Sequence, residues 1–149
     1  MMTSFRDQMR AKLAGRCVHF NGSAINKSCA QSIVYEELTD NYQKRLPCFA
    51  FVSKTDTRVV AQCDKKQLLT QIEIEKEIDE IEAQDAKTAL AHAAAHEHAK
   101  QNGLGKGHGG SGVVKCPVCP DGQIKYSIAS VNGHMWARCT TEGCARWVE

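Results

Sequence analysis

Two pairs of cysteines in the last third of the chain are the residues best suited to chemistry. Cys116 and Cys119 are separated by two residues, Cys139 and Cys144 by four, and 19 residues lie between the pairs. Four thiolates presented on two tight loops are the ligand set that a tetrahedral zinc ion prefers. Because four sulfurs leave no coordination position for water, the pattern predicts a structural zinc site and excludes zinc-catalysed hydrolysis there.

The residues between the pairs must position these loops, and they predict a β-hairpin. Residues 123–131 alternate apolar and polar side chains, Asn132-Gly133 is a favoured two-residue hairpin turn, and residues 134–139 return to the second pair. Pairs and hairpin together resemble the zinc ribbon family over about residues 114–149. The second loop is longer than in many ribbons, which vary at that place. The resemblance implies a small module whose fold depends on its zinc ion.

Four further cysteines lie in the N-terminal part of the chain. Cys17, Cys29, Cys48 and Cys63 follow one another at intervals of 12, 19 and 15 residues, so no two form a tight loop. His19 adds a candidate nitrogen ligand. The alternatives are a second zinc ion, an iron–sulfur cluster or buried free thiols. We expect a bound metal, with zinc ahead of iron–sulfur, because the spacing is wide and the cysteine run of ferredoxins is absent.

Residues 1–63 are expected to form a small cysteine-rich domain. Residues 4–14 predict an amphipathic helix capped by Ser4. The remainder predicts short strands and turns, with apolar runs at 33–35, 48–52 and 59–61 and a short helix near 35–45. A segment of this size buries little core, so a metal is the expected source of its stability.

Residues 64–101 predict one long acidic helix, since they contain neither Pro nor Gly. Asp64 is a plausible N-cap and Asn102-Gly103 a plausible end. Leu68, Leu69, Ile72, Ala83, Ala86 and Leu90 share one side, which is expected to pack on the N-terminal domain. Ile74, Ile78 and Ile81 share the other, at the spacing of a coiled-coil seam. We expect this seam to contact a partner helix, in a second copy or in another protein.

Two histidines of this helix, His92 and His96, are one turn apart and share a face. Such a pair can bind a divalent metal. The His-Glu-x-x-His arrangement of metalloproteases is absent, and histidines are favourable near a helix C-terminus. The sequence therefore favours a solvated helix end.

The glycine-rich residues 102–112 predict a flexible linker between the helix and the ribbon at 113–149. The spacing of a phosphate-binding loop is absent there. The predicted fold class is α+β: a small metal-stabilised N-terminal domain, a long acidic helix, a glycine-rich linker and a C-terminal zinc ribbon.

Aromatic and basic residues occur together on the predicted ribbon. Tyr126, Trp136 and Trp147 are expected to shield the metal side of a module with little core. A second interpretation is that Trp136 stacks on nucleic-acid bases, helped by Lys125, Arg138 and Arg146. Both interpretations remain open at this point.

The composition suggests a cytoplasmic protein without a membrane anchor. The net charge is +2, the first residues lack the apolar run of a signal peptide, and no stretch approaches about 20 apolar residues. Eight cysteines in a reducing compartment favour metal binding over disulfides.

A second resemblance spans nearly the whole chain. The residues that carry it are Cys17-Val-His-Phe-Asn-Gly22, Cys29, Tyr35-Glu-Glu-Leu38, Arg45-Leu-Pro-Cys-Phe49 and Cys63. This pattern, with the acidic helix and the ribbon, is similar to a family of small cysteine-rich proteins of tailed bacteriophages without an assigned activity. The resemblance implies a viral gene product in the host bacterial cytoplasm.

We expect a non-enzymatic zinc-binding protein that engages a host or phage macromolecule. The target classes are nucleic acid, RNA polymerase, and a defence or nucleic-acid-processing enzyme. No arrangement for nucleophilic or acid–base catalysis stands out. Two alternatives remain: an iron–sulfur or redox protein built on the N-terminal cysteines, and an assembly protein that forms a homodimer through the long helix.

Overall fold

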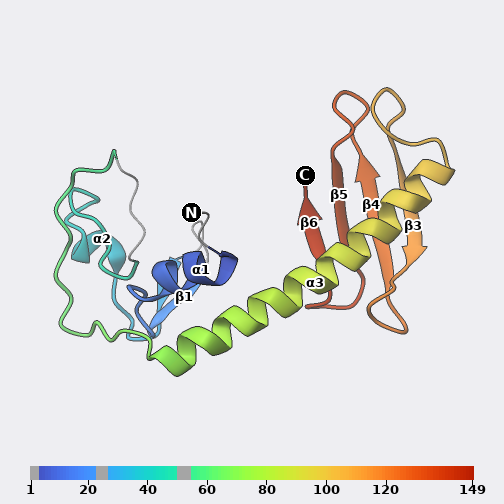
Figure 1. Ribbon diagram of the computed structural model, residues 1–149. Coiled ribbons are helices and arrows are strands. Elements are labelled where there is room, and N and C mark those ends of the chain that lie inside the picture. Colours follow the sequence, from blue (N-terminus) through green and yellow to red (C-terminus); the bar gives the residue numbers. More distant parts are fainter. Residues whose placement is uncertain (1–3, 23–26, 50–54) are drawn as a thin grey trace. The chain divides into compact units, whose positions relative to one another are not determined.

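The structure, a computed structural model, describes residues 4–22, 27–49 and 55–149 (Figure 1). The fold is α+β, with helices and antiparallel strands, as the sequence predicts. Contacts divide the chain into two compact units, Met1–Asp79 and Glu80–Glu149, and the division falls inside the longest helix, α3 (Gln71–Gln101). No helix in the described ranges is long and apolar enough to cross a membrane.

Helix α1 (Phe5–Leu13) forms as predicted, and Ser4 caps it by accepting a hydrogen bond from the backbone N–H of Asp7. Helix α3 begins later than predicted. Thr70 and Glu73 form a capping box there: the Glu73 carboxylate accepts from the Thr70 N–H at 2.7 Å, and the Glu73 N–H donates to Thr70 Oγ1 at 3.3 Å. Asp64 is therefore not the N-cap, because a stronger reciprocal cap lies six residues further on.

The isoleucine seam is filled by the chain itself, which corrects the prediction of a partner seam. Ile74 and Ile78, 5% and 0% exposed, pack with Leu13 of α1 in the first unit. Met9 and Leu69 complete this cluster, and Ile81 is half-buried. The other side of the helix, which was expected to pack on the N-terminal domain, is largely exposed to solvent: Ile72 is 83% exposed. The seam at Ile74 and Ile78 is thus unavailable to a second molecule.

Ion pairs flank this helix contact on its polar side. Arg10 Nε lies 2.7 Å from Glu75 Oε1, and Arg10 Nη2 lies 3.2 Å from the other oxygen. Arg6 contacts Glu75 and Asp79, and Arg16 contacts Glu77. The basic α1 and the acidic start of α3 therefore attract each other, and the two arginines beside Glu75 lower the pKa of its carboxyl to about 2.

The rest of the first unit is built from short elements. β1 (Phe20–Gly22) and β2 (Lys27–Cys29) form an antiparallel pair. α2 (Tyr35–Leu38) is shorter than the helix predicted near 35–45, and residues 33–35 form no strand. Within the predicted strand at 59–61, only an isolated bridge from Val60 to Arg45 forms. The predicted strand at 48–52 extends beyond the described residues.

The second unit contains a four-stranded antiparallel sheet in the order β3-β4-β5-β6. The strands are β3 (Gly110–Lys115), β4 (Gln123–Ile128), β5 (Met135–Cys139) and β6 (Arg146–Val148). The sequence predicts the central strands β4 and β5 but not the edge strands β3 and β6. The turn between β4 and β5 is also wider than two residues, because Ala129 N–H donates to His134 O and closes a four-residue loop.

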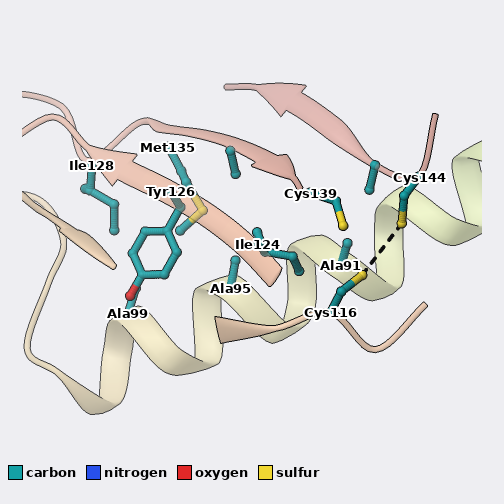
Figure 2. Packing of buried hydrophobic residues seen from close by; sticks show 12 residues of the cluster. Ala91, Ala95, Ala99, Cys116, Ile124, Tyr126, Ile128, Met135, Cys139 and Cys144 are labelled. Atoms are coloured by element: carbon teal, nitrogen blue, oxygen red, sulfur yellow. Dashed lines mark hydrogen bonds between the residues drawn. The ribbon is translucent and has the colours of Figure 1, made fainter. Parts of the chain in front are cut away.

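The C-terminal part of α3 covers one face of this sheet. Ala91, Ala95 and Ala99 recur every four residues and are at most 2% exposed. They pack against Ile124, Tyr126, Met135 and the other inward-facing strand residues (Figure 2). Because alanine side chains are short, the helix lies close to the sheet and the core is thin but continuous.

The glycine-rich residues 102–112 are not a linker throughout, which corrects the sequence prediction. β3 begins at Gly110, and Leu104 packs against the core of the second unit. A Cβ on Gly112 would lie 2.2 Å from Tyr126 Oη, so this glycine makes room for a buried tyrosine. The helix therefore joins the sheet through a packed turn, and the sheet is not a loosely tethered module.

The packing of the first unit is tested by replacing Ile78, which is buried, and Ile72, which is exposed on another side of α3, by alanine in separate variants. We expect I78A to lower the free energy of unfolding by about 2–5 kcal/mol, because it leaves a cavity in a closed cluster. The matched control, I72A, is expected to change it by less than about 0.5 kcal/mol, because Ile72 is exposed. Urea unfolding followed by circular dichroism measures both, and equal effects would contradict the described packing.

Candidate metal centre and open sheet face

The four C-terminal cysteines converge at one end of the sheet. Cys116 and Cys119 lie on the loop between β3 and β4. Cys139 is the last residue of β5, and Cys144 lies on the loop between β5 and β6. Cys116 Sγ lies 3.6 Å from Cys144 Sγ (Figure 2), and Cys119 Sγ lies 3.4 Å from Cys139 Sγ. All four sulfurs lie within 4.8 Å of one another. The predicted ligand set is thus brought together.

Both loops turn in the same way around their first cysteine. The Val118 N–H points at Cys116 Sγ from 3.4 Å, and the Thr141 N–H points at Cys139 Sγ from 3.4 Å. Backbone bonds close each loop, from Cys116 N–H to Gly122 O and from Cys139 N–H to Ala145 O. These N–H groups and backbone bonds orient the two sulfurs, as hydrogen bonds to the ligands of a metal site do.

The arrangement fits a tetrahedral metal ion and does not fit disulfides. Metal–sulfur bonds of about 2.3 Å place sulfur atoms about 3.8 Å apart in a tetrahedron. The distances from Cys116 Sγ to Cys144 Sγ and from Cys119 Sγ to Cys139 Sγ, 3.6 and 3.4 Å, are close to that value and far longer than a disulfide bond of about 2.05 Å. Burial is the largest cause of a raised pKa at Cys144, and the neighbouring thiols add to it, so a bound cation would favour the thiolate form of Cys144.

Gly122 leaves the space that the sulfurs occupy. A Cβ at this position would lie 2.3 Å from Cys119 Sγ and 2.7 Å from Cys139 Sγ. Both contacts are shorter than any side chain tolerates, so Gly122 is required for the sulfurs to converge.

The face of the sheet opposite α3 is open. Two neighbouring rows of side chains lie on it, one of cationic residues and one of uncharged residues that includes a tryptophan. Lys125, Arg138 and Arg146 occupy paired positions on β4, β5 and β6. In the next row, Trp136 pairs with Ser127 on one side and Val148 on the other. Paired residues on neighbouring antiparallel strands point to the same side, about 5 Å apart. The four residues predicted to contact nucleic acid therefore share one surface.

We define the open face by its ten strand residues. They are Ser111, Val113, Lys115, Gln123, Lys125, Ser127, Trp136, Arg138, Arg146 and Val148. Four are cationic and none is acidic. Within the described ranges none of the three paired cations has an ion-pair partner. We call Lys125, Arg138 and Arg146 the basic row. Lys115 is the fourth cation of this face and lies outside the basic row, because it pairs with Gln123. The sequence does not predict its place, because it does not predict the edge strand β3.

The three aromatic residues of the sheet occupy different environments. Trp136 is 52% exposed on the open face, beside a shallow open depression that the basic row also lines. Tyr126 is buried on the helix side, where its hydroxyl lies 2.7 Å from His98 Nδ1. Trp147 is half-buried on that side, with its ring centroid 5.4 Å from that of His92. Only Trp136 can therefore present a free ring face to a ligand.

The N-terminal cysteines lie near one another but converge less closely. Cys17 and Cys48 are buried with Phe20 and Tyr35, and Cys29 packs against them. Burial is the largest cause of the raised pKa of Cys48, about 11, and the nearby Cys17, Cys29 and Cys63 raise it further. Groups of three or more ligand atoms within 4.8 Å of one another occur at two places in the described ranges, and these cysteines form neither. A metal at this position stays a prediction.

Glu149 was missed by the sequence reasoning as a partner of the histidine pair. Its carboxylate lies 2.6 Å from His92 and 2.7 Å from His96. Nothing in the sequence signals this contact, because β6, which carries Glu149 to the helix, was not predicted. Together with the four cysteines, this is the second group of converging ligand atoms.

The G122A variant tests the sulfur centre. Because its Cβ would overlap Cys119 Sγ and Cys139 Sγ, we expect the variant to lose most of its metal at this site and to melt at a lower temperature. G105A is the matched control, since a Cβ there meets nothing within 4 Å. Metal analysis by mass spectrometry and thermal unfolding measure the effect, and full metal content in G122A would contradict the described geometry.

The metal of the N-terminal cysteines is tested by the double variant C17S/C48S. If these thiols hold an ion, the variant binds one equivalent less than the parent and retains the C-terminal equivalent. A brown parent protein that absorbs near ~400 nm and contains stoichiometric iron would establish the iron–sulfur alternative. An unchanged metal content would show that these cysteines are buried free thiols.

Comparison with known proteins found no matching family model, no matching curated protein and no matching solved structure. The resemblances to zinc ribbons and to phage proteins therefore rest on the residues that carry them.

Proposed function

We propose that the protein is a non-enzymatic zinc-binding module that binds single-stranded nucleic acid on the open face of its ribbon-like sheet. The observation that carries the proposal is the row formed by Lys125, Arg138 and Arg146 at paired positions, next to the exposed Trp136. The zinc ion is proposed to occupy the four-cysteine centre, where it supplies the metal–sulfur bonds that join the two loops.

The charge of the open face supports a polyanionic ligand. Like charges placed directly opposite each other on neighbouring strands destabilise a sheet, and no carboxylate on this face offsets them. A bound phosphate backbone would remove that repulsion and release its own counterions. The net charge of +2 understates this surface, because the acidic residues are concentrated in α3.

The aromatic residue favours single strands over duplexes. Trp136 lies on the open face of the sheet, where its exposed ring can contact a planar partner. The faces of nucleic-acid bases are accessible to such a ring only where the bases are unpaired. Arginines beside an aromatic ring add contacts to the backbone or stack on bases themselves. This combination of cationic row and stacking platform is typical of binding without strong sequence preference.

The sulfur centre has a positioning role in this proposal. With four cysteine ligands the ion keeps no open position, so it activates neither water nor substrate. It fixes the two loops that connect β3 to β4 and β5 to β6, and thereby the strand pairing that aligns the cations. The bacteriophage setting implied by the sequence is compatible with host or phage nucleic acid as the target.

Binding is measured by fluorescence anisotropy with labelled single-stranded DNA and RNA oligonucleotides over a range of salt concentrations. We expect W136A to lose about 1–3 kcal/mol of binding free energy at constant salt, as removal of one stacking partner does. R138Q is expected to weaken binding and to reduce the slope of log K against log salt by about 0.7.

The matched control is K100Q, which removes an exposed lysine on α3 outside the open face. It is expected to bind like the parent. Absence of binding by the parent at low salt, or equal affinities of W136A, R138Q and parent, would overturn the proposal. Retention of an RNA polymerase or another protein from host lysate, lost in W136A and insensitive to nuclease, would assign the open face to a protein target instead.

A further inference from the structure

His92, His96 and Glu149 bring three potential metal ligands together on the helix side of the second unit. Glu149 Oε1 lies 2.6 Å from His92 Nε2 and 2.7 Å from His96 Nε2. The two imidazole rings have centroids 4.2 Å apart, as expected for residues one helical turn apart. The pair that the sequence placed on a solvated helix end therefore has a third ligand, supplied from the end of the sheet.

The Glu149 carboxylate is held in position by contacts that do not involve the histidines. Its second oxygen, Oε2, accepts a hydrogen bond from the Met135 N–H at 2.9 Å, and the Glu149 N–H donates to Met135 O at 3.1 Å. Met135 is 0% exposed in the core. Hydrogen bonds of this kind orient the ligands of metal sites, leaving the other oxygen, Oε1, directed at the two imidazoles.

The helix side of the site is also fixed. His92 and His96 lie beside Ala91 and Ala95, which are 0% exposed because they pack against the sheet. The histidine side chains themselves are 41% and 42% exposed, and that of Glu149 is 29% exposed. The backbone of the site is thus anchored, whereas an ion and a water molecule can reach the three ligand atoms.

The geometry points to a second metal site, in which a divalent transition-metal ion of the zinc class binds His92 Nε2, His96 Nε2 and the Glu149 carboxylate. Two imidazoles and a carboxylate are donors that suit zinc, with bonds of about 2.0–2.2 Å. In a tetrahedron, such bonds place neighbouring ligand atoms about 3.3–3.6 Å apart. Glu149 Oε1 and each imidazole nitrogen have to separate by about 0.6–1 Å from their present distances, and the partly exposed side chains leave room for this movement.

This site differs in kind from the four-cysteine centre. Three protein ligands leave a fourth position for water, so the ion is exchangeable and open to solvent, whereas the sulfur centre is closed. The ion would also tie the end of β6 to α3. Without the ion, Glu149 Oε1 takes part in one hydrogen bond with each histidine. Titration with metal distinguishes a metal site from hydrogen bonds alone.

Cobalt(II) is the probe that separates the two centres, because only thiolate ligation gives strong near-ultraviolet charge-transfer absorption. The full-length chain, with any histidine tag removed, is titrated with Co²⁺ and then competed with Zn²⁺. We expect one equivalent of Co²⁺ to bind at the histidine site. Its binding should produce weak absorption bands in the visible range and no increase in the near-ultraviolet thiolate absorption. Metal at the N-terminal cysteines falls in the thiolate signal and does not confuse the count.

E149Q and H96Q are expected to lose this thiolate-free equivalent or to bind it at least about tenfold more weakly, while their thiolate band stays unchanged. The unchanged band shows that the sheet and its sulfur centre remain folded. E97Q and H134Q are the matched controls, since Glu97 hydrogen-bonds Gln101 and His134 is exposed elsewhere in the unit. Both are expected to bind like the parent.

Two outcomes would overturn the inference. The parent binding no metal outside its thiolate sites up to millimolar Co²⁺ would mean that the three residues form hydrogen bonds only. Equal binding by E149Q and the parent would mean that the ion sits on the histidine pair alone, without the carboxylate.

Discussion

The second unit depends on one constraint: the loops at one end of its sheet must bring four sulfur atoms together. Each loop joins a central strand to an edge strand, so fixing the loops relative to each other fixes the register of all four strands. The thin core on the helix side, built on alanines, adds little burial with which to do this. A bound ion at the centre, such as the zinc we propose, makes folding of the sheet and metal binding the same event.

This constraint explains why the two faces of the sheet differ so sharply. The inward face is filled by Ile124, Tyr126 and Met135 against the alanines of α3. The open face contributes nothing to the core, so its residues are free of packing requirements. A row of cations at paired positions is costly there. The polyanionic ligand that we propose for this face would offset that cost, whereas a sheet selected for stability alone would alternate charges or use neutral polar residues.

The sequence predicted those parts of the structure that depend on local spacing. The two cysteine pairs, the alternation from Ile124 to Ile128, and the cap of α1 at Ser4 are all local patterns, and each is present. Contacts between distant residues were the ones missed. The glycine-rich residues 109–112 indicate a linker as long as the contact between Gly112 and Tyr126 is unknown. In the same way, Ile74 and Ile78 indicate a partner seam as long as their packing against Leu13 of α1 is unknown. Side-chain periodicity identifies an apolar stripe but does not say what covers it.

The shortest strand, β6, is where the separate features of the second unit meet. It is an edge strand of three residues that pairs only with β5. Alternation along it sends Arg146 and Val148 to the open face, and Trp147 and Glu149 to the helix side. Such a short edge strand has few hydrogen bonds of its own and would fray if left free. Cys144 lies just before it and Glu149 just after it. Metal ions at the four cysteines and at the histidine site, both proposed above, would therefore hold both ends of β6. With both ions bound, the position of Arg146 in the basic row would depend on metal ligands that lie outside the open face. The proposed nucleic-acid surface and the proposed metal sites would thus be coupled through one strand.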